Sequence, residues 1–200
     1  MVRNKKILIT GHLGFIGFHL AKRMLSEGNI IMGVDSLNNY YSTKLKNSRG
    51  KILENTKGNY SSLIMDLSDE KVIKNIRKFK PDLIINLAAQ AGVRHSLTNP
   101  DDYIKNNISS FINIVKYAKD HEVEKIIYAS TSSVYGGNKD FPFKESDRVD
   151  NPLQFYAVTK RSNELMANAF NDLYKINFIG LRFFTVYGHW GRPDMSIHKF

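Results

Sequence analysis

The stretch that decides the fold is Lys6-Ile7-Leu8-Ile9-Thr10-Gly11-His12-Leu13-Gly14-Phe15-Ile16-Gly17, close to the amino terminus. The apolar run at 6–10 predicts a buried strand, and the glycines after it predict a turn that opens a helix reaching about Gly28. A strand, a glycine turn and a helix are the context in which spaced glycines bind a dinucleotide. Gly11 would allow the tight turn, Gly14 the approach of the pyrophosphate, and Gly17 close packing of the helix. A flexible turn without a ligand is the alternative.

A carboxylate follows the second apolar run. Ile30 to Val34 predict a strand that ends at Asp35, 18 residues after Gly17. In a dinucleotide-binding unit an acidic residue here holds the adenosine ribose, and its charge repels a 2′-phosphate, so the sequence favours NAD over NADP. An aspartate that only caps a turn is the alternative. A third strand is expected over 61–67, where Asp66 would meet the adenine amino group.

The rest of the chain predicts alternating helices and strands. Helices are expected at about 68–79, 100–121 and 155–174, and strands at 83–87, 125–130 and 178–182. No linker rich in proline and glycine and no long repeat divides the chain. The predicted fold class is therefore α/β, a doubly wound parallel sheet of the Rossmann type that forms one NAD-binding domain over residues 1–200.

Composition excludes several classes of protein. The 200 residues contain 42% hydrophobic residues, enough for one buried core, and no cysteine, so we expect no disulfide and no metal site. No apolar stretch approaches the roughly 20 residues that cross a bilayer, and the basic start leads directly into a strand. We therefore expect a cytoplasmic protein with no membrane partner. The net charge of +10 is spread along the chain without a nucleic-acid-binding motif, so no nucleic-acid partner is expected.

Tyr156 and Lys160 stand four residues apart at the start of the last expected helix. Side chains at this spacing share one helical face. A positive charge about 6 Å from a phenol would lower its pKa by roughly two units, although burial would oppose the effect. Tyr156 could then take a proton from an alcohol near neutral pH. A helix turn with a solvated lysine is the alternative.

Polar loops follow three of the expected strands. Ligands in such a fold bind beyond the carboxyl ends of the strands. The loops at 88–94, 131–136 and 183–195 carry hydroxyls, small residues and two arginines, Arg94 and Arg192. This composition suits a substrate with phosphate and hydroxyl groups, because guanidinium groups bind planar oxyanions well.

Taken together, these motifs resemble the extended short-chain dehydrogenase/reductase family and, within it, the UDP-glucuronate 4-epimerases. The resemblance runs from residue 2 to the last residue. It is carried by GHLGFIG at 11–17, LNNYY at 37–41, NLAAQAGVRHS at 86–96, YASTSSVYG at 128–136, YAVTKRSNELMA at 156–167 and LRFFTVYGHWGRPDM at 181–195.

The resemblance implies inversion of a UDP-sugar at C4, with NAD as cofactor and a transient 4-keto sugar. Tyr156 would be the base toward the 4′-hydroxyl, Lys160 would lower its pKa and bind the nicotinamide ribose, and Thr131 would hydrogen-bond the 4-oxygen. The cofactor contacts that the resemblance implies are Gly11, Gly14, Phe15, Ile16, Gly17, Asp35, Asn39, Asp66, Leu67, Leu87, Ala88, Ala89, Asn107, Tyr156 and Lys160.

The resemblance also implies the substrate contacts. Ser132 and Ser133 would contact the sugar, and Arg192, with Arg94 as a weaker candidate, would meet a uronate carboxylate or a phosphate. The related 4,6-dehydratases carry Thr-Asp-Glu where this chain has Thr131-Ser132-Ser133, so the acid and base for dehydration are missing. Epimerisation of a neutral UDP-hexose and decarboxylation of UDP-glucuronate stay open.

Two further implications concern the whole protein. Related epimerases continue far beyond residue 200, so we expect the C-terminal substrate lobe to be largely missing, with only its start at about 188–200. An inactive NAD-binding fragment, or an NAD sensor without a substrate, is therefore an alternative. His95 and Gln154 depart from the family's usual Tyr and Ser. Helices at about 100–121 and 155–174 commonly pair two copies in this family, which suggests a homodimer through a four-helix interface.

Overall fold

The strand order places a ligand crevice near the middle of the sheet. A computed structural model describes residues 3–195, in which six strands pair in parallel in the order β3-β2-β1-β4-β5-β6. This doubly wound order reverses between β1 and β4, and it confirms the expected fold class. The strands are β1 (Lys6–Thr10), β2 (Ile30–Asp35), β3 (Asn59–Ile64), β4 (Leu83–Asn86), β5 (Lys125–Thr131) and β6 (Asn177–Phe183).

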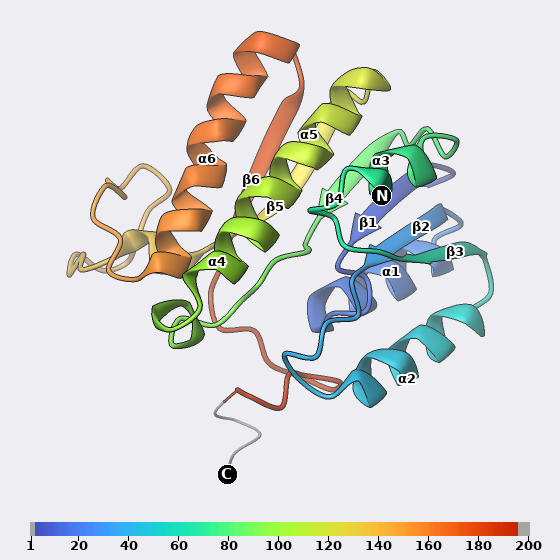
Figure 1. Ribbon diagram of the computed structural model, residues 1–200, viewed down its shortest axis with the longest axis horizontal. Helices are drawn as coiled ribbons and strands as arrows, with labels where there is room; N and C mark the ends of the chain where they lie inside the picture. Colours follow the sequence, from blue (N-terminus) through green and yellow to red (C-terminus); the bar gives the residue numbers. More distant parts are fainter. Residues whose placement is uncertain (1–2, 196–200) are drawn as a thin grey trace.

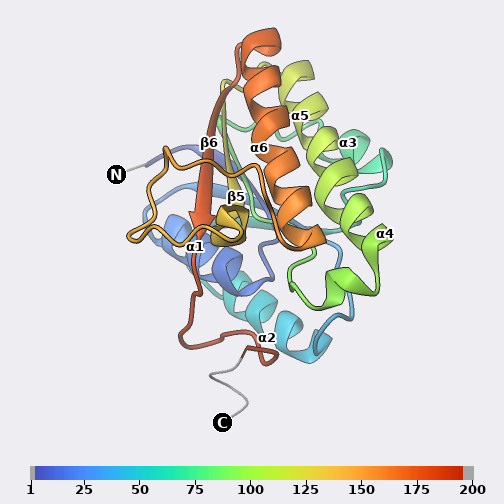
Figure 2. The same cartoon turned by 90° about the vertical axis from the view of Figure 1, so that its left-hand side faces the viewer.

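Helices cover both faces of the sheet (Figures 1 and 2). Helices α1 and α2 pack on one face, and α3, α5 and α6 pack on the other. The α-helices are α1 (Phe15–Ser26), α2 (Thr43–Glu54), α3 (Lys71–Ile76), α4 (Pro100–Tyr103), α5 (Ser110–Asp120) and α6 (Phe155–Tyr174). Short helices of other types are η1 (His95–Leu97), the π-helical η2 (Ile104–Ser109) and η3 (Ser132–Tyr135).

The two faces of β1 belong to two separate cores. Ile7 and Ile9 pack with Leu53 of α2 in one hydrophobic cluster, and all three are fully buried. Leu8 points to the other face and joins the cluster that contains Phe111 of α5. A strand covered on both faces needs apolar residues at successive positions, which explains the unbroken apolar run at 7–9.

Some expected elements have different bounds. The third strand spans Asn59–Ile64 instead of 61–67, because β2 is its only partner in the sheet and β2 ends at Asp35, opposite Ile64. Asp66 therefore lies in the loop that follows. The helix expected at 68–79 is limited to α3, and the helix expected at 100–121 is divided into α4, η2 and α5.

Helix α2 was not expected from the sequence. Its buried residues are Lys46, Arg49 and Leu53, so it turns two cations and one leucine toward the interior. Sequence patterns detect a helix by the period of its apolar residues, and a helix that buries polar side chains lacks that period.

Three whole-protein expectations meet the structure only in part. Within residues 3–195, no helix is both long and apolar enough to cross a membrane. The start of a substrate lobe was expected at 188–200, and residues 196–200 lie outside the described residues. Leu165 and Leu173 are exposed on α6, but pairing of two copies through such helices stays a prediction.

A buried carboxylate joins α6 to β5 and β6. Glu164 accepts hydrogen bonds from Ser130 Oγ at 2.6 Å, from Arg182 Nε at 2.9 Å and Nη2 at 3.1 Å, and from Arg161 Nη1 at 3.1 Å. Burial alone would raise the pKa of Glu164, but the bonds from Arg182 and Ser130 outweigh burial and lower it. Since Ser130 immediately precedes Thr131, this network fixes the end of β5 where the polar loop begins.

We expect Glu164→Gln to remove a pH-dependent part of the stability, on the order of 2 kcal/mol at neutral pH. A carboxyl whose pKa is lower in the folded state than its ordinary value of 4.5 stabilises the fold above that value, and this contribution is lost as the pH falls through the folded pKa. Urea unfolding from about pH 7 to about pH 3 should therefore show the stability difference between wild type and variant shrinking.

The matched control is Glu70→Gln, since the Glu70 side chain is 80% exposed and its ion pair with Lys116 is at the surface. Parallel pH profiles for wild type and Glu164→Gln would contradict the stabilising role of this carboxylate.

Candidate active site

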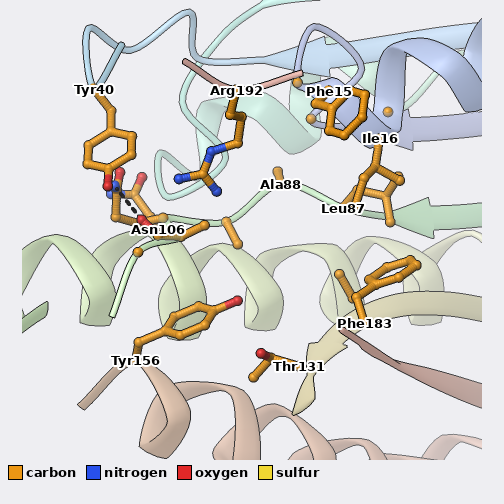
Figure 3. Close-up of a pocket in the computed structure, with 18 of the residues that line it drawn as sticks. Phe15, Ile16, Tyr40, Leu87, Ala88, Asn106, Thr131, Tyr156, Phe183 and Arg192 are labelled. Atoms are coloured by element: carbon orange, nitrogen blue, oxygen red, sulfur yellow. Dashed lines mark hydrogen bonds between the residues drawn. The ribbon is translucent and has the colours of Figure 1, made fainter. Parts of the chain in front are cut away.

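A cleft of about 1100 Å³ lies over the carboxyl ends of β1, β4 and β5, where the strand order reverses (Figure 3). This is the position at which doubly wound sheets bind ligands. In Figure 3 one wall carries Phe15, Ile16, Tyr40 and Arg192, the opposite wall carries Thr131, Tyr156 and Phe183, and Leu87 and Ala88 lie between them.

Most of the site residues predicted from the sequence line this cleft. They are Gly11, Gly14, Phe15, Ile16, Gly17, Asp35, Asp66, Leu67, Leu87, Ala88, Ala89, Arg94, Thr131, Ser132, Ser133, Tyr156, Lys160 and Arg192. Asn39 lines a smaller adjoining hollow of about 600 Å³, together with Asp66 and His95. Asn107 lines neither space. In the described part of the chain, no three His, Cys, Asp or Glu side chains gather as metal ligands.

The glycine turn leaves no room for side chains. Gly11 has φ +70°, and a Cβ there would lie 2.8 Å from the backbone nitrogen of Ala88. A Cβ on Gly17 would lie 2.2 Å from the carbonyl oxygen of Gly11. These contacts bring the start of α1 against β1 and β4, so that backbone N–H groups at the helix start face the cleft. Such a start binds phosphate groups through its free N–H groups and its dipole.

Two carboxylates lie at the end of the crevice next to β2 and β3. Asp35 ends β2, is buried, and accepts hydrogen bonds from the N–H groups of Leu37 at 2.9 Å and Leu13 at 3.2 Å. Asp66 forms an ion pair with Lys105 at 2.8 Å. Since each carboxylate has about four acceptor positions, both can accept further hydrogen bonds from ribose hydroxyls or from an adenine amino group.

Asn107 holds the structure together next to the cleft. Its Oδ1 accepts the N–H of Gln90 at 2.8 Å, and its Nδ2 donates to the carbonyl of Gln90 at 3.1 Å and to Thr159 Oγ1 at 3.0 Å. The side chain thus joins the loop after β4 to α6. Any effect of Asn107 on a cofactor would pass through that loop, because its own amide group is already engaged.

The three predicted catalytic residues converge where β5 ends and α6 begins. Figure 3 shows the Tyr156 ring extending into the cleft beside Thr131. Thr131 Oγ1 also accepts the N–H of Ser133 at 3.2 Å. Lys160 is buried on the same helix, and its Nζ donates to the carbonyl of Ala129 at 2.8 Å.

The proton affinities of this group differ from the sequence expectation. We expected Lys160 to lower the pKa of Tyr156, but burial raises that pKa, and the opposing influences are the Thr131 side chain and the charge of Arg192. Burial also lowers the pKa of Lys160 to about 8. The reason is that a poorly hydrated site disfavours both the phenolate and the ammonium ion. In the protein alone, Tyr156 is therefore a neutral phenol at neutral pH.

Arg192 lies opposite Tyr156 but already has an anionic partner. Its Nε and Nη2 donate to the two oxygens of Asp194 at 3.0 and 2.5 Å, and its guanidinium lies 5.6 Å from the centre of the Tyr40 ring. A substrate anion would have to compete with Asp194 for this guanidinium or use donors that Asp194 leaves free. Arg94 lines the same cleft and is exposed.

The cleft-lining residues that sequence reasoning did not single out include Tyr40, Tyr41, Lys46 and Asp194. Three of these four belong to α2 or to the loop before it, the helix that sequence patterns missed. The available signal was the LNNYY motif, which marks this loop without revealing its contacts.

Comparison with known proteins agrees with this architecture. A model of the NAD dependent epimerase/dehydratase family matches residues 7–200. The chain is 52% identical over 202 residues to an uncharacterized protein of Methanocaldococcus jannaschii, covering 100% of this chain and 62% of that protein. It is 45% identical over 196 residues to a probable UDP-glucuronate 4-epimerase of Rhizobium meliloti, covering 98% and 57%.

A solved structure matches nearly the whole of this chain. The crystal structure of UDP-glucuronic acid 4-epimerase from Bacillus cereus, in complex with UDP-glucuronic acid and NAD, matches with a TM-score of 0.88 and 33% identity, covering 96% of this chain and 60% of that one. The chain thus spans about three fifths of the length of these relatives. Because the family model matches all but the first few residues, the chain belongs to the NAD dependent epimerase/dehydratase family.

Proposed function

We propose that this chain catalyses NAD-dependent 4-epimerisation of a UDP-sugar, with UDP-glucuronate converted to UDP-galacturonate. The observation that carries the proposal is the convergence of Thr131, Tyr156 and Arg192 on one cleft that begins at the glycine turn. The similarity to UDP-glucuronate 4-epimerases of other organisms supports the choice of substrate.

The residues at the cleft fit NAD. Gly11, Gly14 and Gly17 line the cleft, and backbone packs too closely at Gly11 and Gly17 for any side chain. N–H groups at the start of α1 would bind the pyrophosphate there. Asp35 would accept the adenosine ribose hydroxyls, and its negative charge disfavours the 2′-phosphate of NADP. When bound, NAD supplies reversible hydride transfer at sugar C4.

Proton transfer falls to Tyr156. As a phenolate, Tyr156 takes the proton of the sugar 4-hydroxyl and becomes a phenol, and it returns this proton once the sugar presents its other face. Thr131 holds the 4-oxygen through its hydroxyl. Because burial raises the pKa of Tyr156, a phenolate there needs nearby positive charge. Lys160 and the oxidised nicotinamide ring would supply that charge together.

The substrate anion would bind between the walls of the cleft. Ser132 and Ser133 offer hydroxyls on the Tyr156 side, and Arg192 offers a cation opposite them. This arrangement suits either a uronate carboxylate or the diphosphate, so a neutral UDP-hexose epimerase or a UDP-glucuronate decarboxylase is a related candidate. A second candidate function is NAD binding without turnover, which the glycine turn and Asp35 by themselves would support.

Burial brings proton exchange at Lys160 closer to neutral pH than in an ordinary lysine. Lys160 lies within a core that cannot hydrate an ammonium ion, and its pKa falls from 10.5 to about 8. A charged Lys160 therefore reduces the stability of the fold while supplying the positive charge that a Tyr156 phenolate needs.

Incubation of the purified chain with UDP-glucuronate and NAD should yield UDP-galacturonate, separable by anion-exchange chromatography, because the proposed reaction inverts C4 without net oxidation. Nucleotide released by denaturing the protein is measured in parallel. Bound NAD without any product would identify a nucleotide-binding chain and overturn the epimerase proposal.

Tyr156→Phe should lower turnover by roughly 10²- to 10⁴-fold, the usual contribution of a general base, while the NAD dissociation constant stays within about twofold. The measurement pairs product formation with NAD titration. Tyr187→Phe is the control, because it removes the same hydroxyl from a side chain that is 69% exposed. Equal turnover in wild type and Tyr156→Phe would be incompatible with the proposed role of the phenol.

The stability of wild type relative to Lys160→Met should rise by about 3 kcal/mol as the pH rises from about 8 to about 10.5. A buried lysine with a lowered pKa destabilises the fold while it is charged. Above pH 8 the folded state loses this proton while the unfolded chain still binds it up to about pH 10.5, so the penalty disappears over this range. Chemical unfolding at several pH values measures the difference. Lys116→Met, at a 57% exposed side chain, should show no such slope.

A further inference from the structure

Arg49 is a buried cation on α2 that contacts three separate segments. Its side chain is wholly buried, and Nη1 donates to the carbonyl of Leu13 at 2.8 Å and to the Tyr41 hydroxyl at 2.7 Å. Nη2 donates to the carbonyls of Trp190 at 2.6 Å and Gly191 at 3.4 Å. These acceptors belong to the glycine turn, to the loop before α2 and to the chain that follows β6.

No carboxylate within residues 3–195 forms an ion pair with Arg49. Its Nε is also buried without a hydrogen-bond partner. Burying a guanidinium group without a carboxylate is costly, and an apolar residue of similar size would fill the space with less penalty. What an apolar residue could not do is hold four acceptors on three segments in fixed positions, because the planar guanidinium directs its donors.

On one side Arg49 fixes the glycine turn. The peptide groups of Leu13 are engaged at both ends, since its N–H donates to Asp35 Oδ2 at 3.2 Å and its carbonyl accepts from Arg49. The turn that would cradle the dinucleotide phosphates is thus held between the carboxylate that ends β2 and the guanidinium from α2.

On the other side Arg49 fixes the chain that leads to Arg192. The Trp190 ring lies 5.8 Å from the ring of Phe18 on α1, and His19 on the same helix hydrogen-bonds the His189 carbonyl at 2.8 Å. Residues 189–191 therefore lie against α1, and Arg49 hydrogen-bonds two of their carbonyl groups. Arg192 follows directly, and Figure 3 shows its guanidinium reaching into the cleft.

We propose that Arg49 is a positioning residue, which fastens residues 189–192 to the glycine turn. It holds in one geometry the backbone that takes the dinucleotide phosphates and the guanidinium that faces the substrate anion. The identity of these two ligands rests on the proposed function, but the fastening itself does not. Loss of Arg49 should release residues 189–192 and weaken dinucleotide binding together.

Trp190 reports on this contact directly, because it is the only tryptophan of the chain and its side-chain environment is set by the fastened segment. In Arg49→Lys, one ammonium group replaces the planar guanidinium group, so it can keep only some of the four hydrogen bonds. We expect acrylamide to quench Trp190 fluorescence more strongly in folded, nucleotide-free Arg49→Lys than in wild type. We also expect the dissociation constant for NADH, followed by energy transfer from Trp190, to rise roughly 10-fold, the loss of about one charge-assisted hydrogen bond.

Far-UV circular dichroism and a thermal scan establish that each variant is folded at the temperature of the quenching measurement. Tyr41→Phe is the milder variant, because it removes only the hydroxyl that accepts from Arg49, and it should shift quenching in the same direction by a smaller amount. Arg77→Met, which removes an exposed cation from the surface beyond α3, is the control and should leave both readouts unchanged.

Unchanged quenching in folded Arg49→Lys would overturn the proposal, and if that variant does not fold, unchanged quenching in Tyr41→Phe would do so. The quenching readout uses no ligand, so it also separates the two proposals. If wild type does not bind NADH, the proposed function fails in its cofactor, while the quenching series still decides whether Arg49 fastens residues 189–192.

Discussion

The cleft depends on the contact of bare backbone at Gly11 and Gly17. A Cβ at either position would meet main-chain atoms at 2.8 Å or less, so any side chain would force apart β1, α1 and the loop after β4. These three elements define the crevice, so its shape depends on the lack of a side chain at Gly11 and at Gly17. The same closeness exposes the N–H groups at the start of α1 to the cleft, which makes a steric requirement of the fold into a phosphate-binding surface.

Buried charge around the cleft is arranged in three different ways. Glu164 is paired with two arginines and fixes the end of β5, and Arg49 has only neutral acceptors and joins segments that are distant in sequence. Lys160 has a single carbonyl partner, and burial lowers its pKa. Glu164 is fully paired, and its charge mainly stabilises the fold. Lys160 is incompletely paired beside the cleft, and such a group is a candidate for contact with a ligand.

Prediction from sequence worked best where the physics is local and periodic. The apolar runs of β1, β2, β4, β5 and β6 located these strands to within about two residues. For β1 and β4 the reason is that a strand buried on both faces must be apolar throughout. Prediction failed for α2, whose inner face carries Lys46 and Arg49. The place of Asn107 at the cofactor stays a prediction, and its side chain joins a loop to α6 in the structure. In both cases the polar side chains are buried by partners far away in the chain.

The sequence by itself determined the doubly wound sheet, the glycine turn, the carboxylate that ends β2 and the presence of Tyr156 and Lys160 on one helix, because each follows from residue type and short spacing. Only the tertiary structure decided the protonation state and the interaction partners of the charged and titratable groups. Burial raises the pKa of Tyr156, and Arg49 connects α2 to the chain after β6. These properties depend on desolvation and on contacts between segments more than a hundred residues apart, and neither is encoded in any local pattern.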